Sequence, residues 1–461
     1  MSKRENIPLQ VIDEMYVSER KIYPRDVDGT FQRLRRWAVF VLLGLYYGVA
    51  WFNWDGRQAV LWDLPARKFY VFGLSFWPQD FIFLALLLII AGLSLFFFTA
   101  LAGRLWCGYA CPQTVWTETF LWIEHWLEGD RPQRMKLDAG PWNANKIKRK
   151  GGKHLLWIVF ALWTGFTFVG YFTPIRELAG RFWPFEWSSW ETFWVLFYSF
   201  ATWGNAGFMR EQVCKYMCPY ARFQSAMFDR DTLIIAYDEK RGEDRGARKR
   251  GTDYKAKGLG DCIDCTICVQ VCPTGIDIRD GLQYECIACG SCIDACDEVM
   301  DRMGYPRGLV RYTTQHQLED KQTHVFRWRI VVYAILLLAI TVGLGLSIAW
   351  RKPVIMDVIR DRNALYRETY EHQIQNGYML RIINKTESAQ RFELELVGPP
   401  SLTFARHPGV IELPPEEVRT VGVMLSAPAS DVKGKVDIEF VLKSEGSDFS
   451  LTESSRFFAP E

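Results

Sequence analysis

Residues 262–296 contain the stretch that most constrains the fold, CIDCTICVQVCPTGIDIRDGLQYECIACGSCIDAC. The spacing C-x2-C-x2-C-x3-C occurs in it twice, over Cys262–Cys272 and over Cys286–Cys296. In this spacing three thiolates of each copy bind one cubane cluster, and the fourth binds the cluster of the other copy. The predicted ligands are Cys262, Cys265, Cys268 and Cys296 for one 4Fe–4S cluster and Cys286, Cys289, Cys292 and Cys272 for the other.

Zinc is the alternative for these cysteines, because C-x2-C pairs also hold structural zinc ions. The duplicated four-cysteine register favours the iron–sulfur interpretation. The stretch resembles a bacterial two-cluster ferredoxin, and this resemblance predicts a small α+β module. One departure is Asp297, which stands where the first copy has Pro273.

A second repeat contains the other four cysteines, in Cys107–Pro112 (CGYACP) and Cys214–Pro219 (CKYMCP). Both copies read C-x-Y-x-C-P and follow an apolar run, which indicates an internal duplication. Because residues four apart share a helix face, each cysteine pair could bind a metal or form a redox couple. Each proline is expected to begin the next helix. The four thiols and Met217 suit Cu(I), zinc or iron–sulfur, and cysteines that only pack are the alternative.

Five apolar runs predict transmembrane helices, although the mean hydropathy of the whole chain is only −0.06. A run of about 20 residues crosses a hydrocarbon core of about 30 Å. The runs are residues 37–54, 81–102, 155–173, 190–208 and 330–350. The run at 190–208 is the weakest because Glu191 and Asn205 lie near its ends, and a buried or surface helix is its alternative.

Lysine and arginine predict the orientation of these helices. They are concentrated in residues 1–36 and 104–153, which the positive-inside rule assigns to the cytoplasm. Five spans then place residues 230–326 in the cytoplasm and residues 351–461 outside. All 12 cysteines lie in segments assigned to the cytoplasm, where thiols stay reduced. No cleavable signal peptide is visible, so the first run is expected to be an uncleaved anchor.

The last hundred residues predict an all-β domain. Alternating or β-rich patterns occur at Tyr378–Asn384, Gln390–Val397, Val418–Ser426, Lys435–Lys443 and Leu451–Phe458. Turn signals separate them at Asn376-Gly377, Gly398–Pro400, Pro414-Pro415 and 444–447. This spacing predicts a sandwich of immunoglobulin type without the cysteine pair of antibody domains. With no catalytic constellation in it, docking is its expected role.

Other features are less specific. His125 and His154 could assist a metal or quinone near the membrane interface, although interfacial anchoring is the commoner role. The basic stretch Lys240–Lys257 is interpreted as a solvated linker rather than a lipid-binding or partner-binding site. A net charge of +2 argues against a nucleic-acid binder. The predicted spans lack buried paired charges, which argues against ion transport.

The chain is thus predicted to be a multi-domain integral membrane protein. Its expected segments are a cytoplasmic tail (1–36), a four-span membrane domain with both C-x-Y-x-C-P motifs (37–229), a cytoplasmic ferredoxin module (230–326), a fifth transmembrane helix (327–350) and a periplasmic sandwich (351–461).

Cys107–Pro112, Cys214–Pro219, the two-cluster stretch and the outer sandwich together resemble the CcoG/FixG/RdxA polyferredoxins. That family assists assembly of the cbb3-type cytochrome c oxidase in the bacterial inner membrane. The resemblance implies reduction of Cu(II) to Cu(I), with copper as the substrate ion. It makes Cys107, Cys111, Cys214 and Cys218 the expected copper-binding and redox thiols. It also implies oxidase-assembly and copper-delivery proteins as partners and an unidentified cytoplasmic electron donor. A homodimer is one oligomeric option.

Two other functions stay open on the sequence. One is a quinol-linked electron-transfer subunit like the NapH-type polyferredoxins, which share C-x3-C-P motifs. The other is a non-enzymatic assembly scaffold in which the clusters are structural or sensing elements. The outer sandwich favours the accessory function over the NapH-like one.

Overall fold

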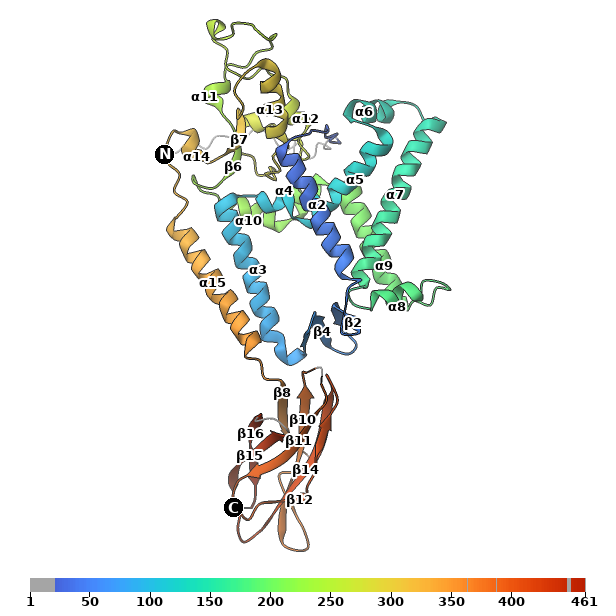
Figure 1. The fold of residues 1–461 in the computed structure, drawn as a ribbon, viewed down its shortest axis with the longest axis vertical. Coiled ribbons are helices and arrows are strands. Elements are labelled where there is room, and N and C mark those ends of the chain that lie inside the picture. The colour runs from blue at the N-terminus through green and yellow to red at the C-terminus, as the bar shows by residue number, and fades with distance from the viewer. Residues whose placement is uncertain (1–20, 363, 387, 446–448, 461) are drawn as a thin grey trace, which may run out of the picture. The chain divides into compact units, whose positions relative to one another are not determined.

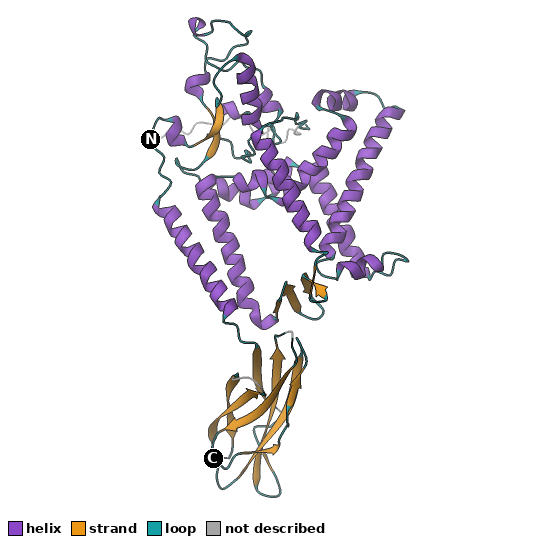
Figure 2. Cartoon of the chain, viewed as in Figure 1, coloured by secondary structure: helices purple, strands orange, loops and turns teal. Residues whose placement is uncertain are grey.

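The computed structural model describes residues 21–362, 364–386, 388–445 and 449–460, so residues 1–20 of the expected tail lie outside the described residues. The chain divides into two compact units. The first contains residues 1–61 and 85–341, and the second contains residues 62–84 and 342–461. Helices dominate the first unit and strands the second (Figure 2).

The first unit combines long helices with short helical segments (Figure 1). In chain order they are α2 (Thr30–Val49), α3 (Phe81–Ala102), α4 (Leu105–Tyr109), α5 (Pro112–Glu128), α6 (Arg131–Ala139), α7 (Ala144–Val169), α8 (Ile175–Gly180), α9 (Ser189–Thr202), α10 (Pro219–Met227), α11 (Glu239–Gly242), α12 (Ile267–Gln270), α13 (Ser291–Met303), α14 (Gln315–Leu318) and α15 (Trp328–Ala349). Two π-helical segments, η3 (Trp203–Met209) and η4 (Val213–Met217), follow α9.

Three of the five expected spans are long, strongly apolar helices. Among the described residues, the helix ending at Ala102, α7 and α15 are long and apolar enough to cross a membrane. The other two expected spans are also helical but do not meet this standard. Helix α2 begins earlier than expected, at Thr30, and buries the polar side chains of Gln32 and Arg35. Helix α9 ends at Thr202, where the π-helical segment η3 begins.

Helix α5, which begins directly after Cys111, is anchored by a buried ionic network. The Glu124 carboxylate is fully buried and lies 2.6 Å from the guanidinium of Arg210. Arg134 and Lys153 approach the same carboxylate at 3.8 and 3.9 Å. The indole of Trp157 on α7 donates a hydrogen bond to the carbonyl of Phe120 at 3.1 Å. These contacts fix the helix that carries the first C-x-Y-x-C-P motif.

The ferredoxin stretch packs around a small two-stranded sheet. Strands β6 (Ile234–Tyr237) and β7 (Val310–Thr313) pair antiparallel. Their side chains join those of α13 and of the cysteine loops in one apolar core. The expected mixture of helix and strand is therefore present at this module.

The second unit contains an antiparallel β-sandwich. One sheet has the order β12-β14-β10-β8, with β9 also paired to β10, and the other has the order β13-β11-β15-β16. The strands are β8 (Val354–Arg360), β9 (Arg367–Glu368), β10 (Gln373–Asn384), β11 (Gln390–Val397), β12 (Thr403–Arg406), β13 (Ile411–Leu413), β14 (Val418–Pro428), β15 (Lys435–Ser444) and β16 (Ser450–Phe458). The five expected strands are confirmed, and the all-β expectation with them.

The expected turn at Asn376-Gly377 is wrong, because both residues lie inside β10. Asn376 is buried, and its side chain donates to the carbonyl of Phe458 at 2.8 Å and accepts from the amide of Phe458 at 3.1 Å. The side-chain amide thus satisfies the backbone of a strand in the other sheet, a role that no local turn signal reveals.

Residues 62–84 belong with the sandwich unit, not with the membrane domain to which they were assigned. They include β4 (Lys68–Val71) and β5 (Leu74–Phe76), which form a hairpin. The ammonium of Lys385 lies 2.6 Å from the carboxylate of Asp80, and both side chains are buried. The ammonium of Lys68 donates to the carbonyl of Glu416 at 2.6 Å. These long-range polar contacts hold the hairpin against the sandwich.

Candidate functional site

The first expected group of cysteines surrounds one cavity. Asp264 and Thr266 have positive φ angles of 52° and 55°, which curl the loop between the cysteines around the cavity. The fourth cysteine comes from α13, in the second copy of the spacing. The cavity-lining thiols are Cys262, Cys265, Cys268 and Cys296.

The second expected group surrounds a separate cavity. Its loop is curled at Ala288 and Gly290, whose φ angles are 52° and 80°. Its thiols are Cys272, Cys286, Cys289 and Cys292, and Cys268 also reaches its wall. Each cavity therefore has three cysteines from one copy and the fourth cysteine of the other copy, which is the exchange that the spacing predicts; Cys268 lines both cavities.

Both cavities fit a polynuclear group better than a single zinc ion. Among the residues that the structure describes, no three His, Cys, Asp or Glu side chains gather closely enough to hold one metal ion. The thiols instead surround each cavity, with apolar side chains such as Met300 and Ile276 between them. A 4Fe–4S cluster takes four separate thiolates, so the donor set and its arrangement fit that cofactor.

Burial raises the pKa of several of these thiols. It raises the pKa of Cys268, Cys286 and Cys296, each to about 12. The pKa of Cys292 is raised well above its usual value for the same reason. These free thiols would be neutral at physiological pH, so binding of a metal group must release protons.

Arg279 holds the loop of the first cavity in place. Its guanidinium donates to the carboxylates of Asp264 at 2.5 Å and Asp277 at 2.6 Å. Asp264 lies between Cys262 and Cys265 in the chain, and Arg279 itself lines the cavity. The hydrogen bond from Arg279 holds the pKa of Asp277 below its usual value, despite partial burial.

The two C-x-Y-x-C-P motifs have similar local structures. Cys107 lies in α4, and Cys214 lies in the π-helical segment η4. Pro112 and Pro219 are the first residues of α5 and α10, which confirms that each proline begins a helix. The expected shared helical face is wrong, however. The second cysteine of each motif has extended backbone, with ψ angles of 128° and 107° at the N-caps of these helices, because a residue before proline avoids helical conformation.

The four thiols of these motifs lie close enough to influence one another electrostatically. Burial raises the pKa of Cys107 to about 12, and the neighbouring Cys111 and Cys214 contribute to the rise. Burial likewise raises the pKa of Cys214 to about 11, with contributions from Cys111 and Cys218. The Cys107 thiol donates to the side-chain oxygen of Gln224 on α10 at 3.2 Å, so the two copies of the repeat meet here. All four are free thiols.

The first motif packs directly against the second cysteine cavity. A Cβ atom on Gly108 would stand 2.7 Å from the carbonyl oxygen of Ile287 and 2.9 Å from the Cα of Cys289. The hydroxyl of Tyr109 donates to the carbonyl of Cys289 at 3.2 Å and lies 3.4 Å from the hydroxyl of Tyr312. Backbone of the Cys107–Cys111 segment thus contacts backbone that carries a cavity-lining cysteine, a juxtaposition that the sequence does not reveal.

The two histidines singled out in the sequence, His125 and His154, have different surroundings. His154 stacks on Phe208 at a ring-centroid distance of 5.8 Å, which fits aromatic packing. His125 lines a different cavity, next to α2.

The interpretation of 240–257 as a solvated linker is wrong in part, because Arg248 lies over the ring of Tyr254 at 4.4 Å and donates to the carbonyl of Gly260 at 2.6 Å. These contacts fold the stretch onto the cysteine module.

Comparison with known proteins supports the iron–sulfur interpretation. A model described as a 4Fe-4S dicluster domain matches residues 209–315, and one described as a 4Fe-4S binding domain matches residues 83–131. The latter segment contains Cys107 and Cys111. A third model, described as an IG-like fold at the C-terminal of FixG, matches residues 344–460.

Full-length relatives agree with these matches. The chain is 38% identical over 429 residues to nitrogen fixation protein FixG of Rhizobium meliloti. This alignment covers 85% of this chain and 82% of that protein. The chain is 40% identical over 435 residues to protein RdxB of Cereibacter sphaeroides, which covers 90% of each. A weaker similarity to ferredoxin-type protein NapH of Haemophilus influenzae, 24% over 225 residues, covers 46% of this chain and 67% of that protein. The chain therefore belongs to the FixG/RdxA family of iron–sulfur proteins.

Proposed function

We propose that this protein transfers single electrons from its eight-cysteine domain to Cu(II) and supplies Cu(I) for assembly of a cbb3-type cytochrome c oxidase. The observation that carries the proposal is the contact of Gly108 and Tyr109 with the backbone of residues 287–289. Because this contact joins the two cysteine systems, electrons need not cross solvent between them.

The eight cysteines of the ferredoxin stretch would hold the cofactor as two 4Fe–4S clusters, which supply one electron at a time when bound. The proposed ligands are Cys262, Cys265, Cys268 and Cys296 for one cluster and Cys286, Cys289, Cys292 and Cys272 for the other. The two separate cavities support this assignment.

Copper would be bound as a substrate by Cys107, Cys111, Cys214 and Cys218. Thiolates are soft ligands that favour Cu(I) over Cu(II), so these residues pull the copper couple toward reduction. The two motifs differ in exposure. Met217 in the second motif is 55% exposed, whereas Gly108 in the first is buried. This difference favours entry of the ion on the side of the second motif.

The proposed topology has five transmembrane helices in the bacterial inner membrane. Helices α3, α7 and α15 support it by their length and apolar character. Helices α2 and α9 would be the remaining spans. The excess of lysine and arginine in residues 1–36 and 104–153 favours a cytoplasmic cysteine module and a periplasmic sandwich. On that side of the membrane the sandwich would meet oxidase-assembly or copper-delivery proteins.

The test uses anaerobically purified, chemically reduced protein. Cu(II) is added, and the cluster absorbance and EPR signals are followed together with a Cu(I)-specific chelator. We expect oxidation matched by stoichiometric Cu(I). A variant with Cys107, Cys111, Cys214 and Cys218 all changed to Ser should retain the reduced-cluster spectrum but reduce Cu(II) far more slowly. A wild-type rate in this variant contradicts the copper role of the thiols.

The same experiment discriminates two other functions. The similarity to NapH favours electron transfer linked to quinol without copper, which predicts reduction by quinol but no oxidation by Cu(II). A non-enzymatic scaffold predicts clusters that keep their oxidation state during copper delivery. Iron content adds a further check, because two 4Fe–4S clusters require about eight iron atoms per chain. A higher content would indicate that the four C-x-Y-x-C-P thiols also hold an iron–sulfur group.

A further inference from the structure

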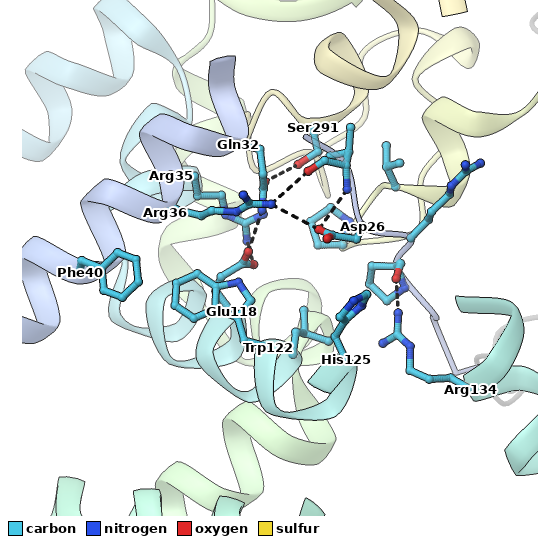
Figure 3. A pocket seen from close by; sticks show the side chains of 16 residues that line it. Asp26, Gln32, Arg35, Arg36, Phe40, Glu118, Trp122, His125, Arg134 and Ser291 are labelled. Carbon is cyan, nitrogen blue, oxygen red and sulfur yellow. Dashed lines mark hydrogen bonds and ion pairs between the residues drawn. The ribbon is translucent and has the colours of Figure 1, made fainter. Parts of the chain in front are cut away.

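A cavity of about 370 Å³ lies between α2, α5 and the cysteine loops of the first unit. Its volume is in the range of small-molecule sites, about 300–1,000 Å³. Figure 3 shows Trp122 and His125 on one helix, with Phe40 and Arg134 at opposite ends of the view. Three walls of different chemistry enclose this cavity, and together they restrict what it can bind.

The polar wall contains two buried arginines, Arg35 and Arg134. Arg35 and Arg134 are 4% and 3% exposed, and within the described part of the chain the Nε–H group of each has no hydrogen-bond partner. Their terminal nitrogens are engaged elsewhere. Arg35 pairs with Glu118 at 2.9 Å, and Arg134 donates to the carbonyl of Pro24. Both arginines line the cavity, so its polar wall carries positive charge that favours a ligand with oxygen acceptors.

The apolar wall is formed by side chains of α2, the helix at the first predicted span, and of α5. Phe40 and Trp122 have ring centroids 5.4 Å apart and line the cavity beside Leu121. On the same helix as Phe40, Trp37 and Val41 are 70% and 54% exposed. In the proposed topology these apolar side chains meet lipid. A planar ring with an apolar tail could therefore reach the cavity from the membrane.

The third wall belongs to the cysteine loops. Val271 and Pro273, which line the cavity, flank Cys272 in the chain, and Ser291 directly precedes Cys292. Cys272 and Cys292 both line the second cysteine cavity. A ligand bound here would thus contact residues that are adjacent in the chain to two thiols of that cavity.

We propose that this cavity binds the head group of a membrane quinol and is the point where electrons enter the protein. The inference rests on the proposed function and names its electron donor. Oxidation of one quinol breaks two O–H bonds and yields the quinone, two protons and two electrons. The electrons leave through the Val271–Pro273 wall and reduce two Cu(II) ions to Cu(I). The two protons leave to solvent past His125, which is exposed on α5.

The test measures binding of the short-chain analogue decylubiquinone to the purified full-length protein by equilibrium dialysis, and anaerobic bleaching of its clusters by decylubiquinol. We expect binding of one analogue per chain. Trp122→Ala should weaken it about tenfold, as expected for an aromatic side chain at the centre of a binding site. The matched control is Trp126→Ala on the same helix, which does not line the cavity and should change the Kd less than twofold. His125→Ala should slow bleaching by the quinol but leave reduction by dithionite unchanged.

The outcomes separate this inference from the proposed function. Absence of binding, or equal effects of Trp122→Ala and Trp126→Ala, overturns the quinol site even if dithionite-reduced protein reduces Cu(II). Binding of anionic phospholipid vesicles in place of the quinone, with the same dependence on Trp122, also overturns it and identifies a lipid site. If decylubiquinol binds and bleaches the clusters but Cu(II) does not reoxidise them, the quinol site stands and the copper function fails.

Discussion

Replacement of Gly108 by alanine tests the contact between the two cysteine systems most directly. The added Cβ would stand 2.7 Å from the carbonyl oxygen of Ile287 and 2.9 Å from both the carbonyl oxygen of Ala288 and the Cα of Cys289. Ordinary van der Waals contact begins at 3.4 Å, so α4 and this loop must separate by the difference of 0.7 Å. All three opposing atoms belong to backbone and cannot rotate away. Overpacking of this kind costs about 1–3 kcal/mol.

We expect Gly108→Ala to retain both clusters but to transfer electrons to Cu(II) more slowly. A misplacement of about 1 Å can cost about 100-fold in rate, and we expect about tenfold here. The assay mixes reduced protein with Cu(II) in a stopped-flow instrument and follows the cluster absorbance, with iron content measured on the same sample. Gly151→Ala is the control, because a Cβ there meets nothing within 4 Å. Equal rates for the two variants would refute the reasoning.

Three further predictions concern stability. Tyr109→Phe removes the hydroxyl that donates to Cys289 and should lower the free energy of unfolding by about 0.5–1.5 kcal/mol. It should also shift the EPR signal of the adjacent cluster, and an unchanged signal counts against the contact. Glu124→Gln leaves buried cations without their carboxylate and should cost about 3–5 kcal/mol in a denaturant titration, whereas the exposed Glu177→Gln should stay within about 0.5 kcal/mol. Arg279 lowers the pKa of Asp277 from 3.8. The stabilisation of the folded state by this interaction is therefore present above pH 3.8 and is lost as the pH falls through the lowered pKa. The difference in unfolding midpoint between wild type and Asp277→Asn should therefore be constant at neutral pH and vanish in acid.

Local spacing predicted the four cysteines that line each cavity, but not that Cys268 lines both. Ligands of one group come mostly from a short loop, and the exchange of Cys272 and Cys296 follows from the position of the fourth cysteine in each copy. Alternation in sequence likewise predicted the bounds of β11, Gln390–Val397, because one face of a sandwich strand is buried. In both places the pattern that specifies the structure lies within a few residues.

Residues whose contact partners lie far away in the chain could not be interpreted correctly from the sequence. Asn376-Gly377 has the composition of a turn, yet the side chain of Asn376 satisfies a strand 82 residues away. Asp80 follows the β4–β5 hairpin, and the partner of its carboxylate, Lys385, lies 305 residues away. Arg248 has the sequence context of a basic linker, yet its guanidinium contacts the ring and hydroxyl of Tyr305, 57 residues away. The chemistry of each residue is visible in the chain, but its partner is not.

The two C-x-Y-x-C-P motifs differ at the residue that follows the first cysteine. The first copy has Gly108 after its first cysteine, and only a residue without a side chain permits the close approach to Cys289. The second copy has Lys215 at that position, so it could not make the same contact, and its Tyr216 and Met217 are 60% and 55% exposed. A duplicated motif that merely packed would have no need of this asymmetry. The proposed function would use this asymmetry, because electrons would arrive on the buried side of the site and the ion on its exposed side.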